Sequence, residues 1–199
     1  QVAGGFVAEN DLAFGGDPPR SAAFVLCVGS REEKGFTGCS RYCCPTAIKQ
    51  ALELNKRGID TTVFYRDIRT ISSGAEEMYR QARGLGVLFV RIPPDEKPAV
   101  VGRDQAWAVR CFDELLNRQI EVPVDAVILS VGMRPRPDAD RFHMMLKASL
   151  GLDGFFLERH PELAPVETAV EGVPITERIE TFAGDNEMPA CAPPRDLTR

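Results

Sequence analysis

The stretch that decides the fold is "VLCVGSREEKGFTGCSRYCCP", residues 25–45. It begins inside the apolar run "AAFVLCV", which has the length of a central parallel strand buried on both faces. It ends on Pro45, which suits the first turn of a helix because its missing N–H needs no partner there. The stretch therefore predicts a strand, a charged loop and the start of a helix, and it carries four of the six cysteines.

The segments that follow continue this alternation. We expect a helix over 43–58 that ends at Gly58, a strand over 61–67, a second helix over 74–86 and a third strand over 87–92. Strands and helices that alternate with short connections are typical of a parallel sheet. The fold class we predict is α/β, with a Rossmann-like unit at its centre.

After the third strand, the pattern changes to shorter segments. Residues 98–102, 106–113 and 118–124 predict an antiparallel meander beside the Rossmann-like unit. The segment 125–136 then returns to a buried strand, which ends at Gly132. The parallel sheet should therefore gain a fourth strand from a point far along the chain.

Beyond the returning strand, the pattern is less regular. We expect a helix over 138–151 with Asp138 near its N-cap, because aspartate accepts hydrogen bonds from free helical N–H groups. Residues 155–173 predict a hairpin or an extended crossing, and the tail after Pro174 predicts no regular structure.

Composition excludes several classes of protein. Apolar residues make up 44% and charged residues 27% of the 199, as in ordinary globular proteins, and the net charge of −5 leaves no basic face for nucleic acid. No apolar run approaches the roughly 18 residues that span a bilayer, so the chain should not be transmembrane. There is no signal peptide and no initial methionine, so we expect a piece of a cytoplasmic protein.

The cysteine spacing is C-x11-C-x3-C-C, formed by Cys27, Cys39, Cys43 and Cys44. Clustered cysteines in a reducing compartment indicate metal or redox chemistry. These four should meet at the carboxyl edge of the parallel sheet, where α/β folds bind ligands. A nucleotide-binding unit would carry G-x-G-x-x-G here, and "CVGSRE" lacks those glycines. We therefore do not expect this unit to bind a dinucleotide.

A metal centre fits this edge better. Four thiolates carry negative charge, which the positive end of the helix dipole favours, and Arg31, Arg41 and Lys49 are close enough in sequence to balance it. Four thiolates are the usual ligands of an iron–sulfur cluster. Zinc also takes four thiolates but prefers C-x2-4-C knuckles, which the adjacent Cys43 and Cys44 do not form.

Adjacent cysteines thus favour a [4Fe–4S] cluster, because its separate irons can each take one neighbour. The spacing is not a standard ferredoxin pattern, so zinc, a redox disulfide and buried unliganded thiols stay open. Cys111 alternates with apolar residues and should face a core. His143 and His160 lack metal-ligand spacing and should be surface or packing residues.

Several motifs, in order, resemble one family. They are "CVGSREE", "GCSRYCC", "VFYRDIRT", "GAEEMYRQARGLGVLFVR", "DAVILSVGMRP" and "GLDGFFLERHPELAPVETAVEGV". Together they resemble the A-type subunit of heterodisulfide reductase and its homologues, which include flavoprotein subunits of the quinone-interacting membrane-bound oxidoreductase complex. The resemblance covers roughly residues 22–173.

The resemblance implies a thioredoxin-reductase-like flavoprotein, in which a second Rossmann-like domain is inserted into an FAD-binding domain. Residues 21–133 would be the inserted domain, and residues 134–199 the returning part of the FAD-binding domain with an irregular tail. Residues 1–20 would be a linker or the tail of the missing FAD half. The family uses the cysteines equivalent to these four to hold a [4Fe–4S] cluster near the flavin.

The resemblance also suggests which residues approach the flavin. Gly132 and Pro135 lie in the crossover "SVGMRP". Apart from the resemblance, Lys49 follows Cys44 in the same helix, where a cation could stabilise a reduced cluster or flavin, unless it is a solvated surface lysine. The segment "VETAVEGV" contributes Thr168, Gly172 and Val173. The fingerprint of the FAD half is absent, so this chain alone should bind FAD weakly or not at all.

The function that follows is electron transfer between a [4Fe–4S] cluster and FAD, toward partner iron–sulfur subunits of a heterodisulfide-reductase-like or membrane-associated complex. The chain would be an oxidoreductase subunit that is inactive alone, with no catalytic acid, base or nucleophile of its own. We also allow for a homodimer. The rivals are a non-redox zinc-binding or structural domain, and a disulfide oxidoreductase that uses Cys43 and Cys44.

Overall fold

The computed structural model describes residues 19–32, 35–103, 106–160, 163–164 and 166–175. Most of the predicted linker and almost all of the predicted tail lie outside these ranges, as does the sixth cysteine, Cys191.

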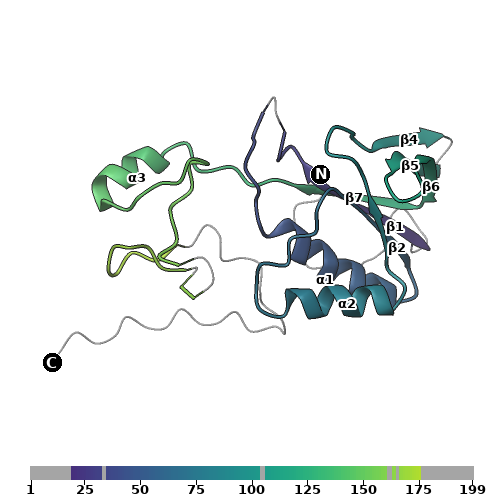
Figure 1. Ribbon diagram of the computed structural model, residues 1–199, viewed down its shortest axis with the longest axis horizontal. Helices are drawn as coiled ribbons and strands as arrows, with labels where there is room; N and C mark the ends of the chain where they lie inside the picture. Colours follow the sequence, from purple (N-terminus) through teal and green to yellow (C-terminus); the bar gives the residue numbers. More distant parts are fainter. Residues whose placement is uncertain (1–18, 33–34, 104–105, 161–162, 165, 176–199) are drawn as a thin grey trace.

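The centre of the molecule is a four-stranded parallel sheet (Figure 1). Its strands are β1 (Ser21–Val28), β2 (Asp60–Tyr65), β3 (Leu88–Arg91) and β7 (Ala126–Val131). Their order is β3-β2-β1-β7, and every neighbouring pair is parallel. The late strand β7 joins the sheet beside β1, as the sequence predicts.

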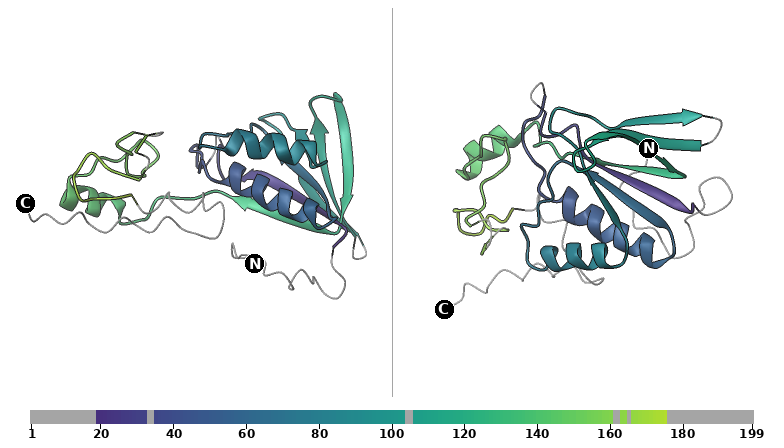
Figure 2. Two further views of the ribbon diagram at one scale, coloured as in Figure 1. Left: turned by 90° about the horizontal axis from the view of Figure 1, so that it is seen from below. Right: turned by 45° about the vertical axis from the view of Figure 1, so that its right-hand side comes forward.

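Two helices cover one face of this sheet (Figures 1 and 2). They are α1 (Cys43–Lys56) and α2 (Ala75–Gly84). Phe24 and Leu26 of β1 pack with Ile48 of α1, and all three side chains are buried. Burying an apolar side chain of this size contributes about 1.5–3 kcal/mol, so this layer holds α1 against the sheet.

A separate antiparallel sheet lies against the other face. Its strands, in the order β4-β5-β6, are β4 (Ala99–Arg103), β5 (Ala106–Asp113) and β6 (Arg118–Val124). Both neighbouring pairs are antiparallel. The predicted class, a Rossmann-like parallel sheet with an antiparallel meander, is confirmed.

The second hydrophobic core lies between the two sheets. Ala23 and Val25 of β1 and Phe64 of β2 pack against Val109 and Cys111 of β5. Strand β1 is therefore buried on both faces, which explains its continuous apolar run. Cys111 is 2% exposed, so the prediction that it faces a core is confirmed.

Strand β1 is interrupted near its carboxyl end. Val25 pairs with Leu129 and Val28 pairs with Val131, so β1 has one residue more than β7 over this interval. Cys27 lies in this β-bulge and has a left-handed backbone with φ of 61°. As a result, Cys27 and its neighbour Leu26 both join the core under α1, although strand alternation would separate them.

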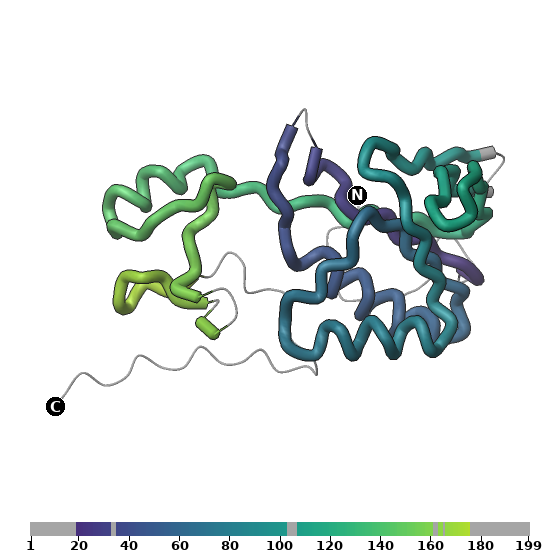
Figure 3. The backbone as a smooth tube through the Cα atoms, in the orientation of Figure 1, coloured from purple at the N-terminus to yellow at the C-terminus, as the bar shows by residue number. Residues whose placement is uncertain are grey.

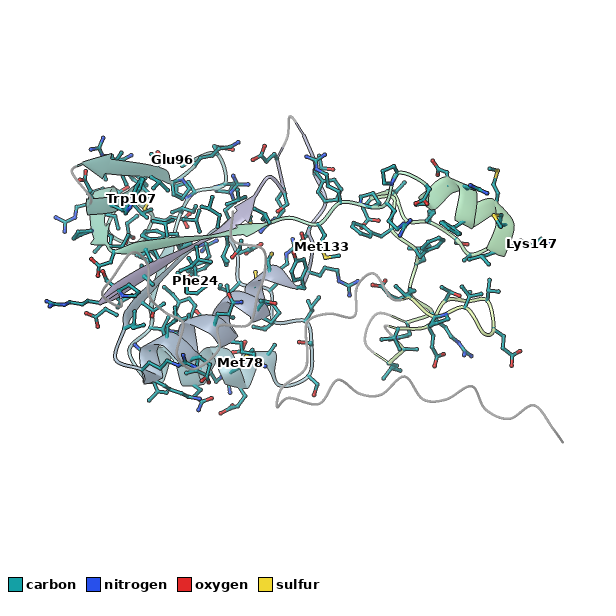
Figure 4. The ribbon with its side chains drawn as sticks, turned by 180° about the vertical axis from the view of Figure 1, so that it is seen from behind. Phe24, Met78, Glu96, Trp107, Met133 and Lys147 are labelled. Atoms are coloured by element: carbon teal, nitrogen blue, oxygen red, sulfur yellow. The ribbon has the colours of Figure 1, made fainter. Side chains whose placement is uncertain are left out.

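After β7, the chain leaves the sheets through a single connection that contains Met133 (Figures 3 and 4). It leads to α3 (Ala139–Leu146), which is shorter than the predicted helix because Lys147 turns left-handed and ends it. Asp138 begins the helix as predicted, but its carboxylate pairs with Arg136 and makes no capping hydrogen bond. The last segment holds only isolated antiparallel bridges among the described residues.

None of the helices in the described ranges is both long enough and apolar enough to cross a membrane.

Candidate functional site

The four clustered cysteines come from three places near the carboxyl edge of β1. Cys27 lies at the bulge of β1, Cys43 and Cys44 begin α1, and Cys39 lies in the loop before it. Cys27, Cys43 and Cys44 are 6%, 4% and 3% exposed, and Cys39 is half-buried. None of these four thiols is in a disulfide. Three of them are therefore held in the core by packing, while the fourth sits on a loop.

The thiols lie close enough to influence one another's ionisation. Burial, followed by the charge of Cys44, raises the pKa of Cys27. A hydrogen bond between Cys43 and Cys44 raises the pKa of Cys43 and lowers that of Cys44, and Cys27 and Cys39 add to the rise at Cys43. The four sulfur atoms therefore form one electrostatic neighbourhood.

The arrangement is not a preformed site for a single ion. Within the described part of the chain, no group of three or more His, Cys, Asp or Glu side chains could hold one metal ion. A tetrahedral zinc would bring its sulfur ligands to within about 3.8 Å of one another, given Zn–S bonds of about 2.3 Å. Any metal centre here would require adjustment of thiol rotamers or of the loop that carries Cys39.

Residues from the loop after β2 complete the neighbourhood. Arg31 Nη2 lies 3.0 Å from Asp67 Oδ2, and Arg66 Nη1 donates to the Arg31 carbonyl at 2.8 Å. The thiol of Cys44 lies 3.7 Å from the carbonyl oxygen of Asp67. Sequence reasoning identified Arg31 but missed Asp67 and Arg66. Their signal was available, because parallel neighbouring strands end at the same edge of a sheet.

Backbone strain is concentrated around the thiols. Cys27, Arg31 and Arg41 adopt left-handed conformations with φ of 61°, 56° and 67°, and they are three of the five non-glycine residues with positive φ in the described ranges. Such residues persist only where the surrounding structure enforces them, and they gather at functional sites. Here the Arg41 N–H points to Cys39 Sγ at 3.4 Å.

Gly132, a predicted flavin-facing residue, lies beside the loop between β1 and α1 that carries Cys39. Its N–H donates to Val28 O at 3.0 Å, immediately after β7. A Cβ atom on Gly132 would lie 2.7 Å from Ser30 Cβ and 3.4 Å from Ser40 Oγ. Ser40 Oγ in turn accepts a hydrogen bond from the N–H of Met133 at 2.8 Å. The structure thus brings Gly132 next to the segment that carries Cys39.

Pro135 lies farther along the crossover, at a shallow open hollow. The ring of Phe36 contacts that of Phe155 edge-on with centroids 6.5 Å apart, and the Arg134 guanidinium lies over Phe36. The hollow is lined by Gly35, Phe36, Thr37, Arg134, Pro135, Leu152 and Asp153. This part of the crossover therefore contacts the same loop that leads to Cys39.

Thr168, Gly172 and Val173 form a compact turn of their own. Thr168 Oγ1 lies 2.8 Å from Val173 O and 3.0 Å from Val170 O, and Gly172 has φ of 78°. The turn uses the Thr168 hydroxyl to hold its own backbone. That these residues approach a flavin stays a prediction.

The remaining predicted residues have ordinary surroundings. Lys49 is half-buried in the second turn of α1, and its role toward a reduced centre stays a prediction. His143 Nδ1 lies 2.6 Å from Ala148 O, and His160 Nδ1 accepts the Leu163 N–H at 3.1 Å. Both histidines therefore make local backbone hydrogen bonds, as packing residues do.

Comparison with curated proteins identifies relatives over most of the chain. The A-type iron–sulfur subunit of CoB–CoM heterodisulfide reductase from Methanocaldococcus jannaschii is 42% identical over 167 residues, which are 80% of this chain and 25% of the relative. The A-type iron–sulfur subunit numbered 2 of the same enzyme from Methanopyrus kandleri is 36% identical over 189 residues, 92% of this chain and 26% of the relative. No protein-family model matches the chain.

By these relatives, the chain belongs to the family of A-type heterodisulfide reductase subunits over the segment that it spans. It spans about a quarter of the length of the curated relatives it matches.

Among solved structures, thioredoxin reductases are similar at low level. That of T. acidophilum has a TM-score of 0.40 and 13% identity, over 77% of this chain and 42% of the other. That of Lactococcus lactis has a TM-score of 0.41 and 16% identity, over 78% of this chain and 43% of the other. At this level of similarity, the fold class rests on the sheet topology of the chain itself.

Proposed function

We propose that this chain is the segment of a heterodisulfide-reductase-like flavoprotein that holds a [4Fe–4S] cluster on Cys27, Cys39, Cys43 and Cys44. The observation that carries the proposal is that these thiols lie near the carboxyl edge of β1 and the N-terminus of α1, close enough to act on one another's ionisation. The name of the M. jannaschii relative, an iron–sulfur subunit, supports it. Partner iron–sulfur subunits belong to the same proposal, and a homodimer stays a prediction.

The chemistry of the donor set fits such a cluster. Four cysteine thiolates are its usual ligands, and three of these thiols are shielded from solvent. The positive end of the α1 dipole and Arg31 favour negative charge at this edge. When bound, the cluster would supply one-electron chemistry, which FAD can join to two-electron chemistry. The chain's own task would be to hold the thiolates and to keep water away from them.

The flavin would lie toward the crossover after β7. Gly132 and Pro135 would contact it, because both lie beside the loop that carries Cys39. Thr168, Gly172 and Val173 are proposed as further contacts on the basis of the family resemblance. Lys49 is proposed to stabilise the reduced cluster or flavin, because its cation lies in the second turn of the helix that begins with Cys43 and Cys44. The rest of an FAD site would come from sequence beyond this chain, which spans a quarter of its relatives.

The test is anaerobic reconstitution of the chain with ferrous iron and sulfide. We expect about four irons and four sulfides per chain, and a brown protein with a broad visible absorbance. Cys43→Ser should lose most of the iron and the absorbance. Cys111→Ser is the matched control, because Cys111 is equally buried but lies in the core between the two sheets.

Two results would overturn the proposal. One zinc per chain with no colour would favour a structural zinc domain. A native chain that binds no metal and has lost two titratable thiols would favour a disulfide between Cys43 and Cys44.

A further inference from the structure

One cation lies beside the thiols with part of its guanidinium shielded from solvent. Arg31 Nη2 pairs with Asp67, but Nη1 of the same guanidinium is buried and has no hydrogen-bond partner among the described residues. The guanidinium lies close enough to Cys27 to interact with its sulfur. A buried donor without a partner costs about 1–3 kcal/mol, so its presence at this edge calls for a reason.

The backbone of Arg31 is held in place by several contacts. Its left-handed conformation is kept by a hydrogen bond from its N–H to Gly38 O at 3.1 Å and by the hydrogen bond of Arg66 to its carbonyl. Such a conformation costs a non-glycine residue about 1–3 kcal/mol. The side chain is therefore fixed from both its ends, by the loop at the backbone and by Asp67 at the guanidinium.

The other nearby arginines are engaged differently. Arg41 pairs with Glu158, whose side chain is only 8% exposed, so the nearby carboxylate neutralises much of the charge of Arg41. Arg69 lowers the pKa of Cys44 mainly through a hydrogen bond from its backbone, and the effect of its charge is smaller than that of Arg31. Asp67, the partner of Arg31, has a half-exposed side chain, so solvent screens it more than it screens the shielded Nη1. The charge of Arg31 acts on Cys27, and at Cys44 it outweighs the charge of Arg69.

We propose that Arg31 is the residue that sets the reduction potential of the centre held by the four cysteines, with Asp67 as its moderating counter-charge. This inference rests on the function proposed above, and it goes beyond it by assigning the control of potential to two residues that are not ligands.

The sign follows from charge. Reduction adds one electron to a centre that is already anionic, and no protein bond forms or breaks. A fixed positive charge in a poorly solvated place stabilises the reduced form more than the oxidised form, and so raises the potential. A guanidinium is always protonated, so the effect does not depend on pH near neutrality.

The experiment is a dithionite titration, with mediators, of the reconstituted chain, followed by electron paramagnetic resonance of the reduced cluster. We expect Arg31→Gln to shift the potential to more negative values and Arg31→Lys to restore most of the shift, because it restores the charge. Asp67→Asn should shift the potential in the opposite direction, by less. Arg110→Gln is the control, because Arg110 pairs with Glu121 on the antiparallel sheet.

The outcomes separate this inference from the function on which it rests. If all variants hold a full cluster and have the same reduction potential, the role of Arg31 is overturned, and the proposed cluster site stands. A native chain that takes up no cluster would overturn both. If Arg31→Gln loses the cluster altogether, Asp67→Asn decides: a potential that is unchanged or more negative contradicts the inference.

Discussion

Gly132 shows at the level of one residue how closely the crossover fits against the thiol loop. It lies immediately after β7, and the two nearest side chains, Ser30 and Ser40, are 1% and 6% exposed. The family resemblance implies that Gly132 lies in the crossover toward a flavin site. The structure gives the glycine a separate reason, because any Cβ there would meet Ser30 at 2.7 Å.

We therefore expect Gly132→Ala to lower the free energy of unfolding by about 1–3 kcal/mol, as overpacking of a buried contact does. The measurement is urea unfolding followed by circular dichroism. Gly84→Ala is the control, since nothing lies within 4 Å of a Cβ at that position at the end of α2. It should be neutral or slightly stabilising, because alanine favours a helix over glycine. Equal losses in the two variants would contradict the close fit.

At the level of elements, the loop before α1 is the part that couples the thiols to the last segment. Arg41 pairs with Glu158, and Phe36 contacts Phe155. The Tyr42 hydroxyl lies 3.3 Å from Val131 O at the end of β7. The loop that positions Cys39 is therefore held by the crossover and by the segment beyond α3.

A double-mutant cycle tests this link. Arg41→Gln and Glu158→Gln should each destabilise the chain, and the double variant should cost less than their sum, with a coupling free energy of about 1–3 kcal/mol. The pair is partly buried, so it should couple more strongly than an exposed pair. Lys56 and Glu53, exposed on α1, provide the comparison cycle, for which we expect about 0.5 kcal/mol or less. Equal coupling free energies in the two cycles would contradict the proposed link between the Cys39 loop and the segment beyond α3.

The elements themselves were largely predictable, and the site was predictable in part. Apolar run length and turn residues indicated every strand and helix of the Rossmann-like unit, because these patterns report local burial. The side on which Cys27 faces was not predictable. Simple alternation would place it with Val25, and only the bulge against β7, a strand about a hundred residues later, turns it toward α1.

At the level of the whole molecule, the described chain has two unequal parts. Both hydrophobic core clusters lie between Ala23 and Ile128. Beyond the crossover, the fully buried residues are few: Ala139, Ala148, Phe155, Thr168 and Ile175. Both core clusters therefore lie before residue 133, and the division into domains at that residue stays a prediction.

We expect a chain of residues 19–133 to fold alone and to unfold cooperatively, because it keeps both cores. Residues 134–175 alone should stay unfolded, since so short a segment buries too little apolar surface. Thermal unfolding followed by circular dichroism, and dispersion of amide signals by nuclear magnetic resonance, would measure both. A chain of residues 19–124 is the control: it lacks β7, the partner of β1, and should not fold. A cooperative fold in that control would contradict this account.

The sequence by itself determined the α/β class, the order of the elements, the parallel unit and the placing of four cysteines near one sheet edge. It could do so because burial, turns and helix starts depend on neighbours in the chain. Only the tertiary structure decided the bulge that turns Cys27, the pairing of Arg31 with Asp67 and the fit of Gly132 against Ser30 and Ser40. These depend on contacts between residues far apart in sequence, which no local pattern specifies.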